Sequence, residues 1–360
     1  MRIILHIGMH KTASTTIQKR LTANNKLLKD FGYVYIAKER KALLKAVEKK
    51  NFKPWLKLIR NTANHGLTPI VSHEAFSHVL CRKLSSKKTT CLGDWLLKKL
   101  NKAGVSVVMI GFIRDQPSYL NSHYTQHVKR FVTALFLEDY AAKAMRPTLQ
   151  KTTCDPVQLF GWLEHHTSVQ TNFFPYGRSI TPQPQQQHAA NDPFAQLVQC
   201  LGIPDSVAFA KVDNLNAQPG DLAIRAALQL SQELKQEGLR LGKKAKLART
   251  LLCTEAKQRH WDQTPYIGLN QELNQRIQDH FSSSNNRFAE RVWGCPWDQI
   301  FTTRPLREAK IPTRKEQDEI DQVTKQIRRK LFRDQGRFTN VIRPIREGFL
   351  NCRNALRIFR

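Results

Sequence analysis

Residues 1–18 read MRIILHIGMHKTASTTIQ, and this stretch predicts how the fold starts. The apolar run of residues 3–7 is typical of a buried strand. It is followed by Gly8, then by Lys11 and a group of hydroxyl residues, and then by a helical pattern. A strand that turns into a helix in this way often binds an anion, because the N–H groups of the first helical turn point at the ligand. We therefore expect an anion-binding loop between Gly8 and Thr16.

The loop does not match the phosphate loop of nucleotide triphosphatases. That motif reads G-x-x-x-x-G-K-[ST], with the lysine directly before the hydroxyl residue that binds magnesium. Counted from Gly8, Ala13 stands at the second glycine and Ser14 stands at the lysine. Lys11 arrives three residues early. The spacing argues against a triphosphatase loop.

Apolar strand-like runs alternate with helical patterns along the chain. The runs are residues 3–7, 33–36, 69–72 and 105–113. Strands separated by helices of this length favour a parallel arrangement covered on both faces. We predict an α/β fold with a mostly parallel central sheet flanked by helices. Further helical patterns cover residues 194–201, 221–253 and 271–293.

The chain is strongly basic, with 58 Lys and Arg against 29 Asp and Glu and a formal net charge of +29. Such an excess favours a polyanionic partner: a nucleotide, an acidic glycan, nucleic acid or an anionic membrane face. Basic residues are dense towards the C-terminus, and we predict a compact domain over residues 1–302 and a basic helical extension over 303–360. An apolar helical stripe in this extension comprises Ile320, Val323, Ile327 and Leu331, and residues 341–359 form a second apolar and basic stretch.

Two interpretations of this extension stay open: an element that contacts a membrane surface or an acidic partner, and a helix that packs its stripe on the main domain. The seven cysteines are widely spread without C-x-x-C spacing, which favours a reducing compartment and no structural zinc. No apolar run approaches the roughly 18 residues of a membrane-spanning helix. We expect a cytoplasmic protein; the first interpretation of residues 303–360 would add peripheral contact at the inner membrane face.

Two motifs together resemble the sulfotransferases that use 3′-phosphoadenosine 5′-phosphosulfate (PAPS). Residues 10–18, HKTASTTIQ, resemble the family loop H-K-T-G-T-T-S-L-Q, with Ala13 in place of the usual glycine. The strand 105–113 is followed by Arg114 and, eight residues later, by Ser122, which is the family's spacing for its 3′-phosphate site. Residues 214–219 and 284–289 resemble further segments of bacterial members. The resemblance implies a P-loop-like sulfotransferase fold.

The resemblance also implies roles for individual residues. Arg114 and Ser122 would bind the 3′-phosphate, Tyr176 would lie beside the adenine, and Lys11 would stabilise the bridging oxygen as the phosphosulfate bond breaks. The loop residues that would hold the 5′-phosphosulfate are His10, Lys11, Thr12, Ala13, Ser14, Thr15 and Thr16. The family needs no metal, and no metal-ligand cluster stands out in this sequence.

A base for the acceptor is predicted after the strand that ends near Ser72. The segment Ser72-His73-Glu74 resembles the family's S-x-E. Glu74 is the first candidate because carbohydrate-directed members use a glutamate near this place. His73 is the second, because other members use a histidine and its pKa suits proton transfer. The expected acceptor is a hydroxyl group, such as that of an acidic glycan or a glycolipid.

Two other classes of function remain as alternatives. One is a nucleotide kinase with a degenerate phosphate loop, which the missing Gly-Lys pair disfavours. The other is a protein that binds nucleic acid or a membrane surface on an inactive sulfotransferase scaffold, which the charge of +29 permits. Of the two partners named for such a scaffold, we expect a membrane surface rather than nucleic acid.

Overall fold

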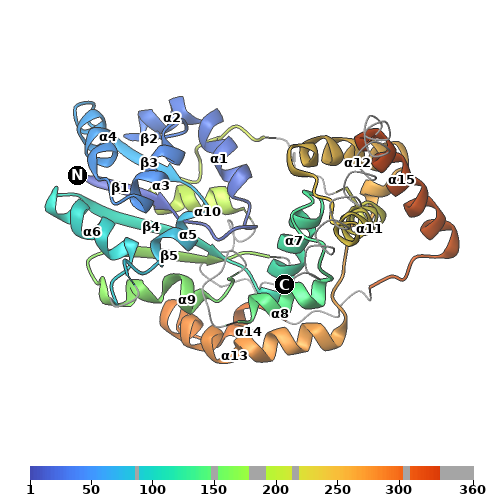
Figure 1. The fold of residues 1–360 in the computed structure, drawn as a ribbon. Coiled ribbons are helices and arrows are strands. Elements are labelled where there is room, and N and C mark those ends of the chain that lie inside the picture. The colour runs from blue at the N-terminus through green and yellow to red at the C-terminus, as the bar shows by residue number, and fades with distance from the viewer. Residues whose placement is uncertain (86–88, 147–152, 178–191, 213–218, 303–308, 333–360) are drawn as a thin grey trace, which may run out of the picture. The chain divides into compact units, whose positions relative to one another are not determined.

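The computed structural model describes residues 1–85, 89–146, 153–177, 192–212, 219–302 and 309–332. Its strands form a five-stranded sheet in the order β2-β3-β1-β4-β5, and every pair of neighbouring strands is parallel (Figure 1). The predicted α/β class with a parallel sheet is confirmed. The strands are β1 Arg2–His6, β2 Tyr33–Tyr35, β3 Thr68–Ser72, β4 Ser106–Ile113 and β5 Gln170–Pro175.

Helices connect the strands and follow the sheet along the chain. Between β1 and β4 they are α1 Ser14–Ala23, α2 Asn25–Asp30, α3 Arg40–Glu48, α4 Lys53–Ala63, α5 Phe76–Leu80 and α6 Leu92–Lys102. The next are α7 Gln116–Val128, α8 Leu137–Ala144, α9 Pro156–Phe160, α10 Pro193–Cys200, α11 Asp221–Gln236 and α12 Ala245–Gln258. The last described are α13 Gln271–Trp293, α14 Trp297–Ile300 and α15 Arg314–Phe332.

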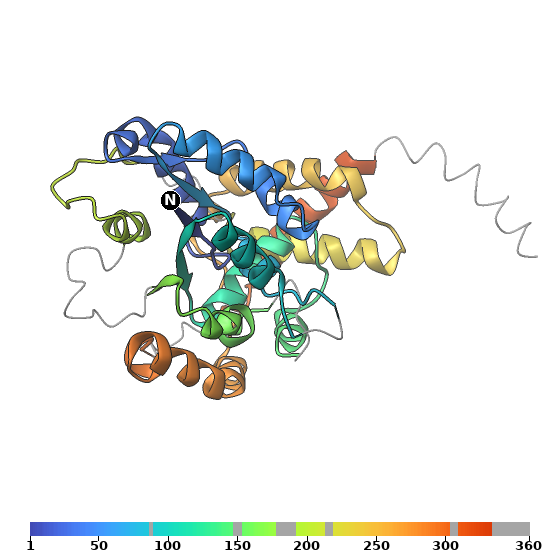
Figure 2. The same ribbon diagram turned by 90° about the vertical axis from the view of Figure 1, so that its left-hand side faces the viewer.

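The sheet is covered on both faces, as the order of the strands requires. The chain moves from β1 outward to β2 and then back through β3 to β4, and right-handed crossovers place the helices of these two movements on opposite faces. Helices α1, α2 and α10 lie on one face, and α3 to α6 lie on the other (Figure 2). Both faces are therefore shielded from solvent, which explains why β4 is buried from Val107 to Ile113.

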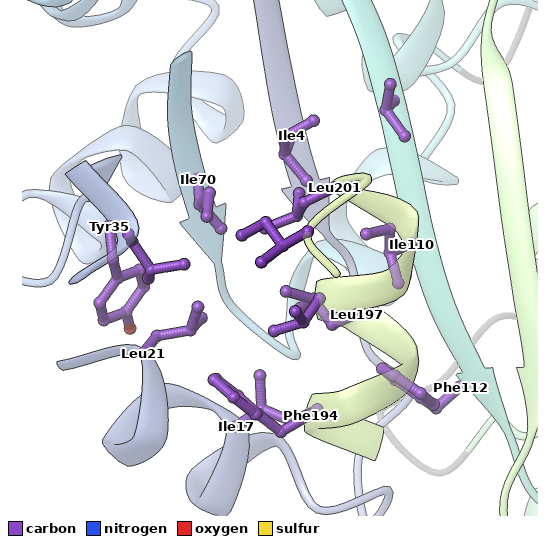
Figure 3. Close-up of a cluster of buried hydrophobic side chains, with 14 residues drawn as sticks. Ile4, Ile17, Leu21, Tyr35, Ile70, Ile110, Phe112, Phe194, Leu197 and Leu201 are labelled. Carbon is purple, nitrogen blue, oxygen red and sulfur yellow. The ribbon is translucent and has the colours of Figure 1, made fainter. Parts of the chain in front are cut away.

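The core on the α10 face joins strands β1 to β4 to the helices α1, α2 and α10. Leu197 of α10 and Leu201, which caps that helix, lie over the strand residues Ile4 and Ile110 (Figure 3), and all four side chains are almost completely buried. From α1, Ile17 and Leu21 close the same cluster. Burial of one such aliphatic side chain stabilises the fold by about 1.5–3 kcal/mol. This packing fixes α1, and hence the loop before it, against the end of the sheet.

The chain divides into two compact units, each built from segments that are separate in the sequence. The first unit holds the sheet and comprises residues 1–124, 137–216 and 268–309. The described part of the second comprises residues 125–136, 219–267 and 310–332.

In the second unit, α15 packs against α11 and α12. The apolar stripe predicted for this helix is buried, and its members are Ile320, Val323, Ile327 and Leu331. The helix of the predicted extension thus supplies an apolar surface that α11 and α12 need, while residues 333–360 lie outside the described chain.

The helical region predicted over residues 221–253 is in fact two helices, α11 and α12. Between them Gly238 and Gly242 adopt left-handed conformations with φ of +70° and +48°, so the first helix ends and the chain turns. The stretch 214–218 of the resemblance lies outside the described residues, as does the apolar and basic stretch 341–359. In the described part of the chain, no helix combines the length and apolar character required to cross a membrane.

Candidate active site

The residues predicted for function meet at the carboxyl edge of the sheet. In a parallel sheet, ligands bind beyond the carboxyl ends of the strands where the strand order reverses, and here that point lies between β1 and its neighbours β3 and β4. The loop after β1 contains Lys11, the turn after β3 contains Glu74, Arg114 follows β4 and Tyr176 follows β5. Four segments far apart in the sequence therefore supply one edge.

The loop after β1 is held against β4 by its backbone. The N–H of Met9 donates to the carbonyl of Phe112 at 3.0 Å, and the N–H of Phe112 donates to the carbonyl of Gly8 at 2.7 Å. Gly8 has φ of +95°, and a Cβ at this position would lie 2.7 Å from the carbonyl oxygen of Glu74. Only glycine fits, because the loop passes directly over the turn that carries Glu74.

Inside the loop, two predicted binding residues hold the backbone in shape. The hydroxyl of Thr12 donates to the carbonyl of Met9 at 2.7 Å, and that of Ser14 donates to the same oxygen at 3.4 Å. Both side chains are buried. Lys11 and Ala13 have φ of +65° and +58°, and left-handed residues of this kind turn neighbouring N–H groups towards one side.

The N-terminus of α1 has the character of an anion site. Ala13 stands at the helix cap, no side chain caps the helix, and its first turn contains no acidic residue. The first N–H groups of a helix lack partners within it and carry a partial positive charge, so an anion is favoured there. The hydroxyl of Thr15 is exposed and that of Thr16 is half-buried at the same turn. The usual glycine is missing, yet Ala13 adopts the left-handed conformation that a glycine would allow.

Arg114 joins the loop to the opposite side of the site. Its Nη1 donates to the carbonyl of Lys11 at 3.1 Å, and its Nε donates to Ser118 Oγ at 2.9 Å. The guanidinium carbon lies 5.9 Å from the centre of the Tyr176 ring. Ser118 Oγ in turn donates to Asp115 Oδ1 at 2.5 Å. The chain Asp115, Ser118 and Arg114 fixes the orientation of the guanidinium beside the loop.

The sequence resemblance points to Ser122, whereas the hydrogen bond described here is to Ser118. Both serines lie on α7, and their spacing of four residues places them on the same face of the helix. Ser122 is half-buried one turn beyond Ser118. The helical period after Arg114 was the signal that could have identified Ser118 as a second hydroxyl facing the arginine.

Glu74 is oriented by a residue of α1 that sequence reasoning left without a role. Gln18 Nε2 donates to Glu74 Oε2 at 3.2 Å and to the carbonyl of Ser72 at 3.3 Å. Burial raises the pKa of Glu74, but its own backbone N–H, the nearby His73 and His10, and the Gln18 amide together lower it more, so the pKa lies below its ordinary value. Glu74 is therefore a carboxylate at neutral pH.

The two candidate bases differ in whether an atom is available to accept a proton. The backbone N–H of Ala75 donates to His73 Nδ1 at 3.2 Å. A neutral imidazole that accepts at Nδ1 carries its proton on Nε2, so Nε2 is a donor and the basic nitrogen Nδ1 is already occupied by the Ala75 N–H. Burial lowers the pKa of His73, and Glu74 opposes this effect. The geometry favours the Glu74 carboxylate as the base.

Several imidazoles lie around this edge, two of which, His78 and His123, were not predicted. The ring centre of His10 lies 5.2 Å from that of His78 on α5 and 6.2 Å from that of His123 on α7. Deeper in the sheet, His6 Nδ1 is 2.7 Å from Ser72 Oγ, its register partner on β3. No group of three or more His, Cys, Asp or Glu residues in the described ranges is arranged to hold a metal ion. No signal in the sequence points to His78 and His123, because only the tertiary structure brings α5 and α7 to the loop.

Comparison of the chain with protein-family models, curated proteins and solved structures found no match.

A cavity of about 450 Å³ lies beside β5 and α13. It is lined mainly by residues 171–174 of β5 and 291–293 of α13, together with residues near His166. None of the predicted site residues lines this cavity. The candidate active site is defined instead by the loop after β1, by Arg114 and by Glu74.

Proposed function

We propose that this chain is a PAPS-dependent sulfotransferase with a P-loop-like sulfotransferase fold, and that it transfers a sulfuryl group to a hydroxyl of a glycan or glycolipid. The observation that carries the proposal is the position of Arg114, whose guanidinium is hydrogen-bonded to the carbonyl of Lys11 and to Ser118. A nucleotide phosphorylated at both the 3′ and 5′ positions needs two cationic sites, and this contact joins an arginine to the anion-binding loop.

The residues present suit such a nucleotide. The uncapped N-terminus of α1 accepts an anionic 5′ group, and the fork of donors on Arg114 suits a phosphate. Tyr176 is half-buried under that guanidinium and offers an aromatic face for a base. When bound, PAPS supplies the sulfuryl group that passes to the acceptor oxygen.

The chemistry requires one proton acceptor and one charge stabiliser. The Glu74 carboxylate removes the proton of the acceptor hydroxyl while the acceptor oxygen forms its bond to sulfur. Lys11 stabilises the negative charge that develops on the phosphate oxygen as the sulfur–oxygen bond breaks. Loss of one donor to a developing negative charge typically costs about 2.7–4 kcal/mol, so Lys11→Ala should reduce the rate of transfer about 10²- to 10³-fold.

Ligand binding tests the nucleotide assignment. We expect 3′-phosphoadenosine 5′-phosphate (PAP), the desulfated product, to raise the melting temperature, since a ligand at roughly 100 times its Kd adds about 2.7 kcal/mol. Arg114→Ala should abolish most of this shift. Arg60→Ala, an exposed arginine on α4, is the matched control that should leave it unchanged. Stabilisation by ATP with magnesium but not by PAP would refute the proposal and favour a kinase.

Transfer of labelled sulfate tests the reaction itself. Wild-type protein should transfer label from PAPS to a hydroxyl of a glycan or glycolipid library. Glu74→Gln should lose this transfer and still bind PAP, because the amide keeps the shape and the contact with Gln18 but cannot accept a proton. If PAP binds and no hydroxyl acceptor is labelled, the scaffold binds the nucleotide without this activity.

A further inference from the structure

The imidazole of His10 stands out within the cluster of histidines at the site. His78 Nε2 donates to the carbonyl of Thr153 at 3.1 Å, and its Nδ1 lies 3.1 Å from Ser77 Oγ. His123 Nδ1 lies 2.7 Å from the hydroxyl of Tyr140. By contrast, no hydrogen bond joins the His10 ring to another residue in the described ranges. His10 is thus the ring that can change its protonation without breaking an existing hydrogen bond.

The groups that face His10 come from every element around the loop. Lys11 adjoins it on the loop itself, His73 and Glu74 lie on the turn after β3, and His78 and His123 contact it from α5 and α7. Burial lowers the pKa of His10, Glu74 raises it, and His73 and Lys11 lower it, with a net value below the ordinary one. The ring is neutral at pH 7, beside a loop built to receive an anion.

We propose that His10 takes up a proton from solvent when an anionic 5′ group enters the loop, so that nucleotide binding is coupled to protonation of this ring. The proposal rests on the proposed function, because it assumes that the loop binds PAP. The physical cause is that an opposite charge within about 4–6 Å favours the protonated form of an imidazole by one to three pH units. Lys11 and the protonated His10 then present adjacent positive charges to the ligand.

Calorimetry measures the proton directly. PAP is titrated into the full chain at pH 7 in two buffers that differ in ionisation enthalpy, and the difference in heat gives the protons taken up. Protonation of the phosphates of free PAP is measured separately and subtracted. Wild-type protein should take up roughly a quarter to a half of a proton per PAP more than His10→Asn. His65→Asn, an exposed histidine in the same unit, should match the wild type.

The affinity for PAP provides a second readout. Between pH 7.5 and pH 6.0, the ratio of the Kd of His10→Asn to that of the wild type should rise about three- to tenfold. Equal proton uptake in the two proteins together with a constant ratio would overturn the role of His10 and leave the nucleotide assignment intact. Failure of PAP to bind the wild type would overturn both.

If His10→Asn does not fold, the wild type still decides: uptake beyond that of the PAP phosphates supports the proposal, and its absence overturns it.

Discussion

Acid should destabilise the unit that contains the sheet before its carboxylates become protonated, because two of its histidines are buried as neutral rings. Burial lowers the pKa of His6 from 6.5 to about 4, and burial lowers the pKa of His78 to about 4 as well. In the unfolded chain each ring regains an ordinary pKa and binds a proton more readily. The stabilisation is therefore complete above pH 6.5 and is lost as the pH falls from 6.5 towards 4.

The magnitude follows from these pKa values. A difference of 2.5 pH units corresponds to about 3.4 kcal/mol per ring when both states are protonated, since one unit is worth 1.36 kcal/mol. At pH 5 the loss is about 2 kcal/mol per ring, or about 4 kcal/mol for the pair. This is a large part of the 5–15 kcal/mol that usually stabilises a folded protein. The lowered pKa values of His10 and His73 act in the same direction.

Urea unfolding between pH 7.5 and pH 5.0, followed by tryptophan fluorescence, measures this loss. Five of the six tryptophans lie in the unit with the sheet, so the signal reports mainly on that unit. His78→Asn should remove about 2 kcal/mol of the pH dependence, whereas His65→Asn, which replaces an exposed ring, should retain all of it. A free energy of unfolding that is constant to within about 1 kcal/mol over this range would refute the reasoning.

Three further substitutions test the packing around the site. Ala13→Gly should stabilise the chain by about 0.5–1 kcal/mol in thermal unfolding. Relief of the left-handed alanine gains about 1–2 kcal/mol, and the greater entropy of glycine in the unfolded chain removes part of this gain. Ala42→Gly on α3, the control, should destabilise the chain. Ser118→Ala should weaken PAP binding by about 1 kcal/mol in calorimetry while the fold stays intact, and unchanged affinity would contradict the role of Ser118 in orienting Arg114. Asn285→Leu should cost about 1–3 kcal/mol in urea unfolding because it removes the amide that donates to the buried Oε1 of Gln116, and the double variant with Gln116→Leu should recover much of this loss.

Much of the sheet could be predicted from the sequence because a parallel strand buried on both faces must be apolar along its whole length. The stretch before Arg114 shows this clearly, as β4 is buried from Val107 to Ile113. The predicted alternation of strands and helices then leaves few arrangements, and it correctly indicates an α/β fold with a parallel sheet. The order of the strands, by contrast, could not be predicted. It depends on the side of β1 to which each crossover leads, and no single residue determines that side.

The helical region of the second unit shows where periodicity is insufficient. Residues 221–253 carry a helical pattern throughout, but Gly238 and Gly242 break it because they allow the left-handed backbone of a turn. The boundary predicted at residue 302 is a local inference, since it rests on Pro305 and Pro312, which interrupt the helical pattern, and on the basic residues beyond them. The structure places α15 with α11 and α12, since the apolar stripe of a helix is buried wherever a complementary surface exists, however distant in sequence.

Parts of the candidate site were also beyond the sequence. The positions of Lys11, Arg114 and Glu74 at one edge follow from strands that can be recognised, since each residue lies within five residues of the end of a strand. Ser118 and Gln18 act through side-chain hydrogen bonds to these residues, and such contacts depend on the exact packing of α7 and α1. Local motifs locate the ends of strands, whereas the partners that orient a functional group are set by the tertiary structure.

The choice between the two candidate bases illustrates the same distinction. By residue type, His73 suits proton transfer at neutral pH better than Glu74. The backbone N–H of Ala75 reverses this preference, because it occupies the one imidazole nitrogen of His73 that lacks a proton. Glu74 has a pKa below its ordinary value and is ionised well below neutrality. If Glu74 is the base, its own protonation does not limit transfer near pH 6, and loss of activity there would have to come from the imidazoles around it.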